Sequence, residues 1–114
     1  MISREQDAVS GRELLEILQA LSNPHRLRVL KILVEGRNYV SQIARQLQIS
    51  RPLLQAHLRK LEQAGLVSSV LELSDDGKLM KFYDVIPFSL ELTPKLIARA
   101  AATLSETKEE ENRD

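Results

Sequence analysis

The segment SRPLLQAHLRKLEQAGL, residues Ser50 to Leu66, constrains the fold more than any other part of the sequence. Ser50 is a favoured N-cap residue, and Pro52 is tolerated in a helix only within the first turn. Gly65 is a typical residue just past a helix end. An apolar stripe at helical spacing, which predicts burial, is formed by Leu54, Leu58 and Leu61. The segment therefore predicts one helix that packs on one side only.

Three helices are predicted before this segment. The first spans residues 10–21 and begins with the capping-box pattern Ser-Gly-Arg-Glu. The second spans residues 23–36, begins with Asn-Pro and is apolar almost all round, so we expect it to be central and buried. The third spans residues 40–47. Only Gln48 and Ile49 separate it from the Ser50 to Leu66 helix, which predicts a tight turn.

The pattern changes to β after this helix. Residues 67–85 hold two apolar runs around Asp76-Gly77, a pair that strongly favours a hairpin turn. Residues 88–92 alternate between apolar and polar, which predicts a short further strand. Thr93-Pro94 begins a last helix, whose narrow apolar seam ends at Leu104.

Length and composition limit the class of protein. The 114 residues are 43% apolar and 28% charged, values typical of a single globular domain. We expect residues 10–104 to form that domain, between a flexible N-terminal arm of residues 1–9 and an acidic flexible tail of residues 105–114. No stretch approaches the ~18 apolar residues that a membrane span requires, and there are no cysteines. We therefore expect a soluble, cytoplasmic protein that makes no membrane contact.

Charge is segregated although the formal net charge is zero. Residues 24–61 hold eight lysines and arginines against one glutamate, a net of +7, so the remainder carries −7. Such a basic segment around a surface helix suits a nucleic-acid partner, whereas the simpler interpretation is a solvated face.

The order of elements is that of a winged helix-turn-helix. We predict a mostly α fold of the α+β class, with the hairpin as the wing. The segments LSNPHRLRVLKIL, VSQIARQLQISRPLLQAHLRKLEQAGLV and DGKLMKFYDV together resemble the ArsR family of winged-helix repressors, across roughly Leu14 to Val85. The resemblance implies a transcriptional regulator that binds double-stranded DNA as a homodimer. It also implies that each Ser50 to Ala64 helix enters a major groove, while the N- and C-terminal helices form the dimer interface.

The exposed side of the Ser50 to Leu66 helix carries side chains that suit DNA. At about 100° per residue, Arg51, Gln55 and Arg59 lie on a ridge turned away from the leucines, with Ala56 beside it. Arginine pairs with guanine and glutamine with adenine, so we predict base readout by Arg51 and Gln55, with Leu53 near a thymine methyl. The predicted phosphate contacts are Gln42, Arg45, Ser50, Arg59 and, in the wing, Lys78 and Lys81.

The predicted dimer interface uses apolar residues of the first and last helices. The last helix follows a complete domain core, so burial against a partner explains its seam, whereas the leucines of the first helix have core packing as an alternative. The candidates are Leu14, Leu15, Leu18, Leu96, Ile97, Ala100, Ala101 and Leu104.

The sequence lacks the metal-sensing motifs of the family that it resembles. Tyr39 and Ser41 stand where those members have C-x-C, and Pro94 to Leu104 contains no histidine or carboxylate. We therefore predict no metal site and no cofactor. The signal stays open between a small apolar ligand at the dimer interface, a protein partner, heat and none. Asp75 and Asp76 at the hairpin tip would repel phosphates, which argues against a strong wing contact.

Both histidines are interpreted as structural. His57 borders the leucine stripe, so we predict a packed residue rather than a DNA contact or a pH switch. His25 is expected at the surface, without a second histidine near it. No set of side chains suggests catalysis, so we predict no enzyme activity. The alternatives to a sequence-specific regulator are a winged-helix adaptor for proteins and a sequence-tolerant, chromatin-like DNA-binding protein.

Overall fold

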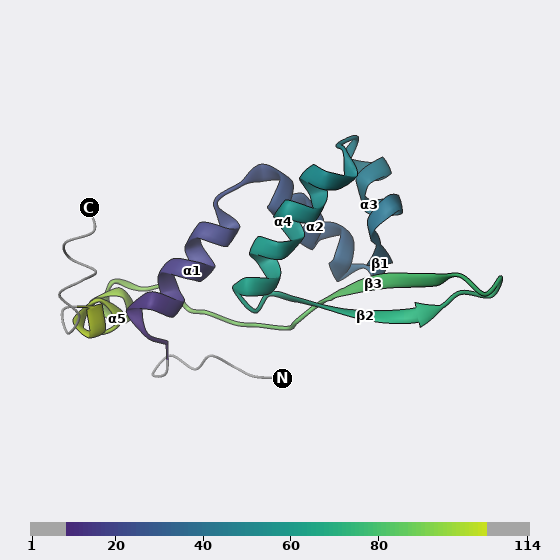
Figure 1. Ribbon diagram of the computed structural model, residues 1–114. Helices are drawn as coiled ribbons and strands as arrows, with labels where there is room; N and C mark the ends of the chain where they lie inside the picture. The colour runs from purple at the N-terminus through teal and green to yellow at the C-terminus, as the bar shows by residue number, and fades with distance from the viewer. Residues whose placement is uncertain (1–8, 105–114) are drawn as a thin grey trace.

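The computed structural model describes residues 9–104 (Figure 1). The elements in these residues are α1 (Gly11–Leu21), α2 (Pro24–Val34), β1 (Asn38–Tyr39), α3 (Val40–Leu47), α4 (Arg51–Gln63), β2 (Val67–Leu73), β3 (Leu79–Val85) and α5 (Pro94–Leu104). The predicted winged helix-turn-helix is confirmed. The predictions for residues 1–8 and for the tail, residues 105–114, lie outside the described part of the chain.

The helices begin where the predicted capping residues stand. The Ser10 hydroxyl accepts from the Glu13 backbone N–H at 3.1 Å, and the Glu13 carboxylate accepts from the Ser10 N–H at 3.1 Å, which completes the capping box of α1. The Asn23 side chain caps α2, and the Ser50 hydroxyl accepts from the Leu53 N–H at the start of α4. These local hydrogen bonds satisfy N–H groups that lack partners within a helix.

The turn between α3 and α4 depends on Gln48, whose backbone is left-handed with φ of 58°. The next residue, Ile49, donates its N–H to the Ala44 carbonyl at 3.1 Å, so the chain reverses within two residues. A side chain with a Cβ disfavours this conformation. Packing of α3 and α4 on the core therefore holds Gln48 in a backbone conformation that glycine would adopt more easily.

The wing is an antiparallel hairpin of β2 and β3, which pair from Val67↔Val85 to Leu73↔Leu79. The short strand β1 adds to the other edge of β3, in the order β1-β3-β2, and was not predicted from sequence. The predicted strand at residues 88–92 is wrong, because this segment has no strand assignment. Of its three alternating apolar residues, only Leu90 packs against the buried residues of α1 and α5, whereas Phe88 and Leu92 stay exposed.

The main core joins α2, α3, α4 and the base of the wing. Its largest fully buried side chains are Val29, Leu33, Ile43, Leu54, Leu58, Leu61, Leu66 and Val67. The prediction that the second helix is buried nearly all round is wrong. Only Val29 and Leu33 of α2 are buried, whereas Leu27 is 51% and Val34 71% exposed, because the other elements pack on one side of this helix.

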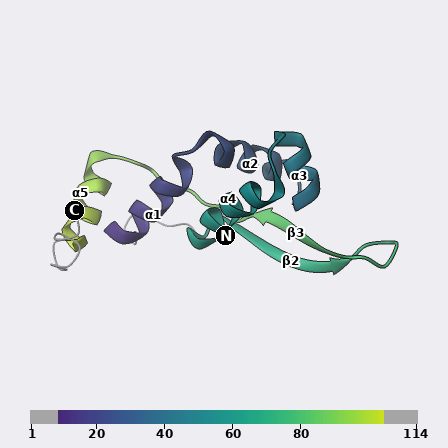
Figure 2. The same cartoon turned by 45° about the horizontal axis from the view of Figure 1, so that its top comes forward.

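A second cluster joins α1 to α5 at the end of the molecule away from the wing tip (Figures 1 and 2). It contains Val9, which the sequence analysis assigned to the flexible arm. Gly11 permits the close approach, because a Cβ there would lie 2.5 Å from Leu104 Cγ. The Gly11 N–H also donates to the Thr103 hydroxyl at 2.8 Å. The two helices therefore form one packed unit.

This packing places part of the predicted dimer interface inside the chain. Leu14, Leu96 and Ala100 are 6%, 2% and 1% exposed, so they lie in the core of their own chain rather than at a free surface. Leu104 is half-buried beside Gly11. The members of the predicted interface that stay exposed are Leu15, Leu18, Ile97 and Ala101.

Candidate nucleic-acid interface

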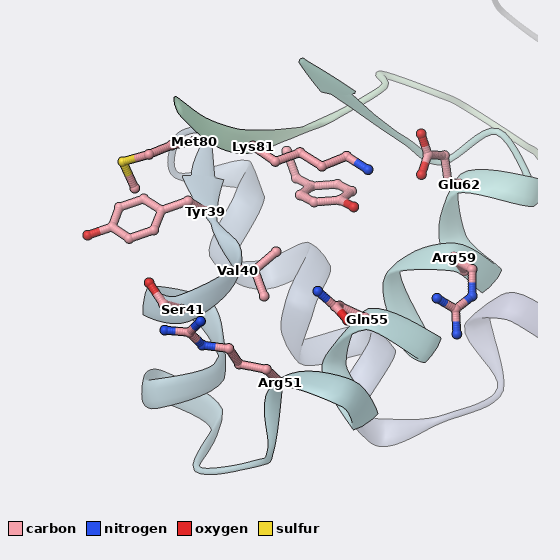
Figure 3. Close-up of a pocket in the computed structure, with 10 residues that line it drawn as sticks. Tyr39, Val40, Ser41, Arg51, Gln55, Arg59, Glu62, Met80 and Lys81 are labelled. Atoms are coloured by element: carbon pink, nitrogen blue, oxygen red, sulfur yellow. The ribbon is translucent and has the colours of Figure 1, made fainter. Parts of the chain in front are cut away.

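The predicted ridge of α4 borders a hollow of about 500 Å³ between this helix and the wing (Figure 3). Arg51, Gln55 and Arg59 line it from α4, and each is exposed. The opposite wall includes Met80, Lys81 and Tyr83 of β3, and Tyr39, Val40 and Ser41 lie at the end where α3 begins. We call this surface the α4–wing hollow. It brings Lys81 beside the ridge, which spacing in the sequence could not show.

The α4–wing hollow carries more positive than negative charge. Arg51, Arg59 and Lys81 line it together with a single acidic residue, Glu62. The Glu62 carboxylate accepts from the Ser69 hydroxyl at 3.2 Å. Glu62 was not among the predicted site residues, although its position three residues after Arg59 places it near the same ridge. A concave, mostly cationic surface of this kind suits a polyanion.

The other predicted DNA contacts lie on exposed or half-buried positions of the same half of the molecule. Leu53 is 43% exposed, and Ala56 is half-buried. Ser50, Arg45 and Lys78 are exposed. The described structure thus leaves every predicted contact at least partly accessible.

Gln42 is oriented by a neighbour. The Tyr39 hydroxyl donates to Gln42 Oε1 at 3.1 Å. This bond occupies the carbonyl side of the amide, so the amide N–H groups are the donors that Gln42 retains for a phosphate.

Two cations of the basic segment, Arg26 and Arg37, have partners within the same chain. Arg37 Nη2 lies 3.0 Å from Glu72 Oε1, and its guanidinium stands 4.4 Å from the centroid of the Phe82 ring. Arg26 donates to two backbone carbonyls of α1. The charge of +7 that the sequence shows for residues 24–61 therefore overstates what a ligand meets, because sequence counts charges without their partners.

The tip of the wing is acidic and ordered by hydrogen bonds. The Ser74 hydroxyl donates to the Asp76 carboxylate, and the Lys78 N–H donates to it at 3.4 Å. The Ser74 hydrogen bond, followed by that of Lys78, lowers the pKa of Asp76. Asp76 therefore keeps its negative charge at neutral pH. This charge repels phosphates and argues against a strong contact between the wing tip and DNA.

The two histidines lie together, contrary to the prediction from sequence. His57 is buried, at 8% exposed, as predicted for a packed residue. The prediction that His25 has no second histidine nearby is wrong, because the ring centroids of His25 and His57 are 5.4 Å apart. Packing of α2 on α4 joins residues that are distant in sequence. Burial, then Arg26 and then His25, lowers the pKa of His57.

Comparison with known proteins identifies the family. The model of the bacterial regulatory protein, arsR family, matches residues 23–69. An uncharacterised HTH-type transcriptional regulator of Methanocaldococcus jannaschii is 34% identical over 87 residues, which cover 76% of this chain and 90% of that protein. The chain belongs to the ArsR family. As an ArsR-family member it is a DNA-binding transcriptional regulator and not an enzyme.

A curated repressor and two solved structures are also similar to this chain. The biofilm growth-associated repressor of Xylella fastidiosa is 32% identical over 68 residues, 60% of each chain. The solved structure of the transcriptional repressor BigR of Xylella fastidiosa is 25% identical, with a TM-score of 0.55 over 83% of this chain and 86% of that one. A homodimeric winged helix-turn-helix domain of Mycobacterium bovis is 22% identical, with a TM-score of 0.57 over 88% of this chain and 82% of that one.

Residues 9–104 contain no group of three or more histidine, cysteine or acidic side chains placed to hold a metal ion. None of the helices in this range is long and apolar enough to span a membrane.

Proposed function

We propose that this ArsR-family regulator acts as a homodimeric repressor that reads an inverted-repeat operator, with one α4 in the major groove of each half-site. The observation that carries the proposal is the α4–wing hollow, where Arg51, Gln55 and Arg59 of α4 face the same space as Lys81 of the wing. A duplex seated on α4 would therefore meet the wing as well.

Each exposed side chain has a defined part in this proposal. Arg51 and Gln55 read guanine and adenine edges, and Leu53 contacts a thymine methyl. Half-buried Ala56 leaves room for close approach of the helix to the groove. The phosphate contacts, which fix the register of the protein on DNA, are Gln42, Arg45, Ser50, Arg59, Lys78 and Lys81.

The homodimer forms through the side of the α1–α5 unit that its own chain leaves open. Leu15, Leu18 and Ile97 are 46%, 37% and 45% exposed, and Ala101 lies one turn after Ile97. The homodimeric protein from Mycobacterium bovis supports a homodimer, and the repressors among the relatives support repression. The site of action is the cytoplasm. The residues do not distinguish between a small-molecule effector, a protein effector, heat and no effector.

The proposal is tested by selection from fragmented genomic DNA with the purified protein at physiological salt, followed by sequencing of the retained fragments. We expect enrichment of an inverted repeat whose half-sites are centred about one helical turn apart, ~10 base pairs. Retention of many sequences with a steep salt dependence would instead indicate a sequence-tolerant binder. Failure to retain DNA would indicate an adaptor for proteins.

A further inference from the structure

The side chain of Arg26 lies where three helices meet. It projects from α2 and donates from Nε to the Ala20 carbonyl at 2.6 Å and from Nη2 to the Gln19 carbonyl at 3.1 Å. Both carbonyls belong to the last turn of α1, where the helix dipole is negative, and the Gln19 carbonyl also accepts from the Ser22 N–H at 3.2 Å. The third nitrogen, Nη1, lies 3.1 Å from Nδ1 of His57 on α4. One guanidinium therefore joins α1 to α4.

The contact defines the protonation state of His57. A guanidinium has donors and no acceptor, so His57 Nδ1 must present a lone pair to it. The ring is then neutral, with its proton on Nε2. A second proton on the ring would place an N–H group against the Arg26 N–H groups at about the same distance, and the hydrogen bond would be lost. The link between α1 and α4 thus exists only while His57 is neutral.

The charged groups around His57 oppose its protonation. Arg26 and His25 face the ring from α2, and the Nδ1 atom of His25 is buried without a hydrogen-bond partner in the described residues. Glu16 of α1 and Lys60 of α4, which carry opposite charges, line a small hollow together with Gln19 and Ala20, whose carbonyls accept from Arg26. Burial and the two basic neighbours on α2 therefore dominate, which agrees with the lowered pKa of His57.

We propose that Arg26 and His57 are positioning residues that couple the α1–α5 unit to the DNA-binding helix α4, and that protonation of His57 opens this link and weakens DNA binding. The effect on DNA rests on the proposed function. His57 lies two residues after Gln55 and two before Arg59, so a displacement of its part of α4 moves both from the α4–wing hollow. The proposal replaces the purely structural interpretation of His57.

The sign of the pH dependence separates this proposal from general electrostatics. Acid adds positive charge to a protein, which by itself strengthens binding to a polyanion. Opening of the link has the opposite effect. We expect affinity of the full chain for its enriched DNA fragment to fall, at constant salt, as the pH is lowered through the NMR midpoint of His57. Well below that midpoint the fall should reach about tenfold for each unit by which DNA binding lowers the pKa of His57. Affinity that is constant or rises as the pH falls would overturn the proposal.

Variants at the two histidines provide matched controls. His57→Gln keeps an oxygen that accepts from Arg26 but does not titrate, so its affinity should not fall in acid. His25→Asn keeps the link and removes one basic neighbour, so the fall should persist with its midpoint at a higher pH. A fall of the same size in His57→Gln and in the unmodified protein would show that the pH dependence arises elsewhere.

The link is also tested without DNA, by ¹⁵N NMR of the histidine rings in the free protein. We expect His57 to carry its proton on Nε2 at pH 8 and to titrate with a midpoint below about 6.5, the ordinary value for histidine. Arg26→Lys, which keeps the charge but loses the fork that reaches both helices, should change the Nδ1 shift. A proton on Nδ1 at pH 8 would disprove the link, even if His57→Gln failed to fold. Absence of DNA binding at every pH, with the NMR result as expected, would contradict the proposed function alone.

Discussion

Ile97→Glu tests the proposed dimer surface without disturbing the core of the chain. Ile97 is 45% exposed on α5, whereas Leu96 beside it is 2% exposed and packs between α5 and α1. A glutamate at position 96 would place a charge inside the protomer and unfold the α1–α5 unit. A glutamate at position 97 instead projects from the side that we propose a partner covers.

The magnitude follows from the exposed fraction. Complete burial of an isoleucine side chain is worth about 1.5 to 3 kcal/mol, so the exposed 45% of Ile97 contributes about 0.7 to 1.4 kcal/mol in each subunit. A two-fold symmetric contact uses the residue twice, which gives about 1.4 to 2.8 kcal/mol. The dissociation constant of the dimer should therefore rise by at least ~10-fold and up to ~100-fold, before the cost of desolvating two carboxylates.

Sedimentation velocity over a range of protein concentrations measures this change, with far-UV circular dichroism as a check on folding. Lys95→Glu is the matched control, because Lys95 is exposed on the same helix about 160° from Ile97. The control should keep the dissociation constant of the unmodified protein. Equal dissociation constants for Ile97→Glu and the unmodified protein would refute the assignment of this face.

Two further predictions concern the backbone and the charges of the interface. Gln48→Gly should raise the free energy of unfolding by about 0.5 to 1 kcal/mol in denaturant titrations, because glycine adopts a φ of 58° without a Cβ clash, whereas Gln46→Gly inside α3 should lower it by about 1 kcal/mol. A lower midpoint for Gln48→Gly would contradict the account of that turn. Arg59→Gln should reduce the slope of log K against log salt by about 0.9 per subunit. Arg37→Gln should leave the slope unchanged, because Glu72 already neutralises that cation, and equal changes in the two variants would show that the charges were wrongly assigned.

The helices were predictable because their ends depend on neighbours in sequence. Ser10 with Glu13, Asn23 and Ser50 all cap the helices that their positions predict. The predicted strand at residues 88–92 failed because alternation describes one chain, while a strand also needs a partner. The alternating segment has none among the described residues, and the two-residue strand β1 became visible only through its pairing with β3.

The site was predictable in part. Periodicity correctly placed Arg51, Gln55 and Arg59 together, because all three belong to one helix. An amphipathic pattern shows that a helix face is buried but not against which surface, so Leu14 in the core and exposed Leu15 looked alike. The pattern of one helix does not predict which other elements that helix contacts.

The features that the sequence did not predict arise from contacts between elements that are distant in sequence. Lys81 reaches the hollow from the wing, and His25 meets His57 through the packing of α2 on α4. A count of charges in the sequence treats Arg26 and Arg37 as free cations, although Arg26 donates to the Ala20 carbonyl and Arg37 pairs with Glu72.

The central claim is that the exposed ridge of α4 reads bases, and the DNA sequences selected by the unmodified protein and by Arg51→Ala test it most directly. Loss of the arginine should lower affinity for the preferred sequence by about 1 to 3 kcal/mol per subunit. It should also relax one base position in each half-site while the other positions keep their preference. An unchanged consensus in Arg51→Ala, with all sequences weakened equally, would show that Arg51 contacts phosphates and that bases are read by other residues.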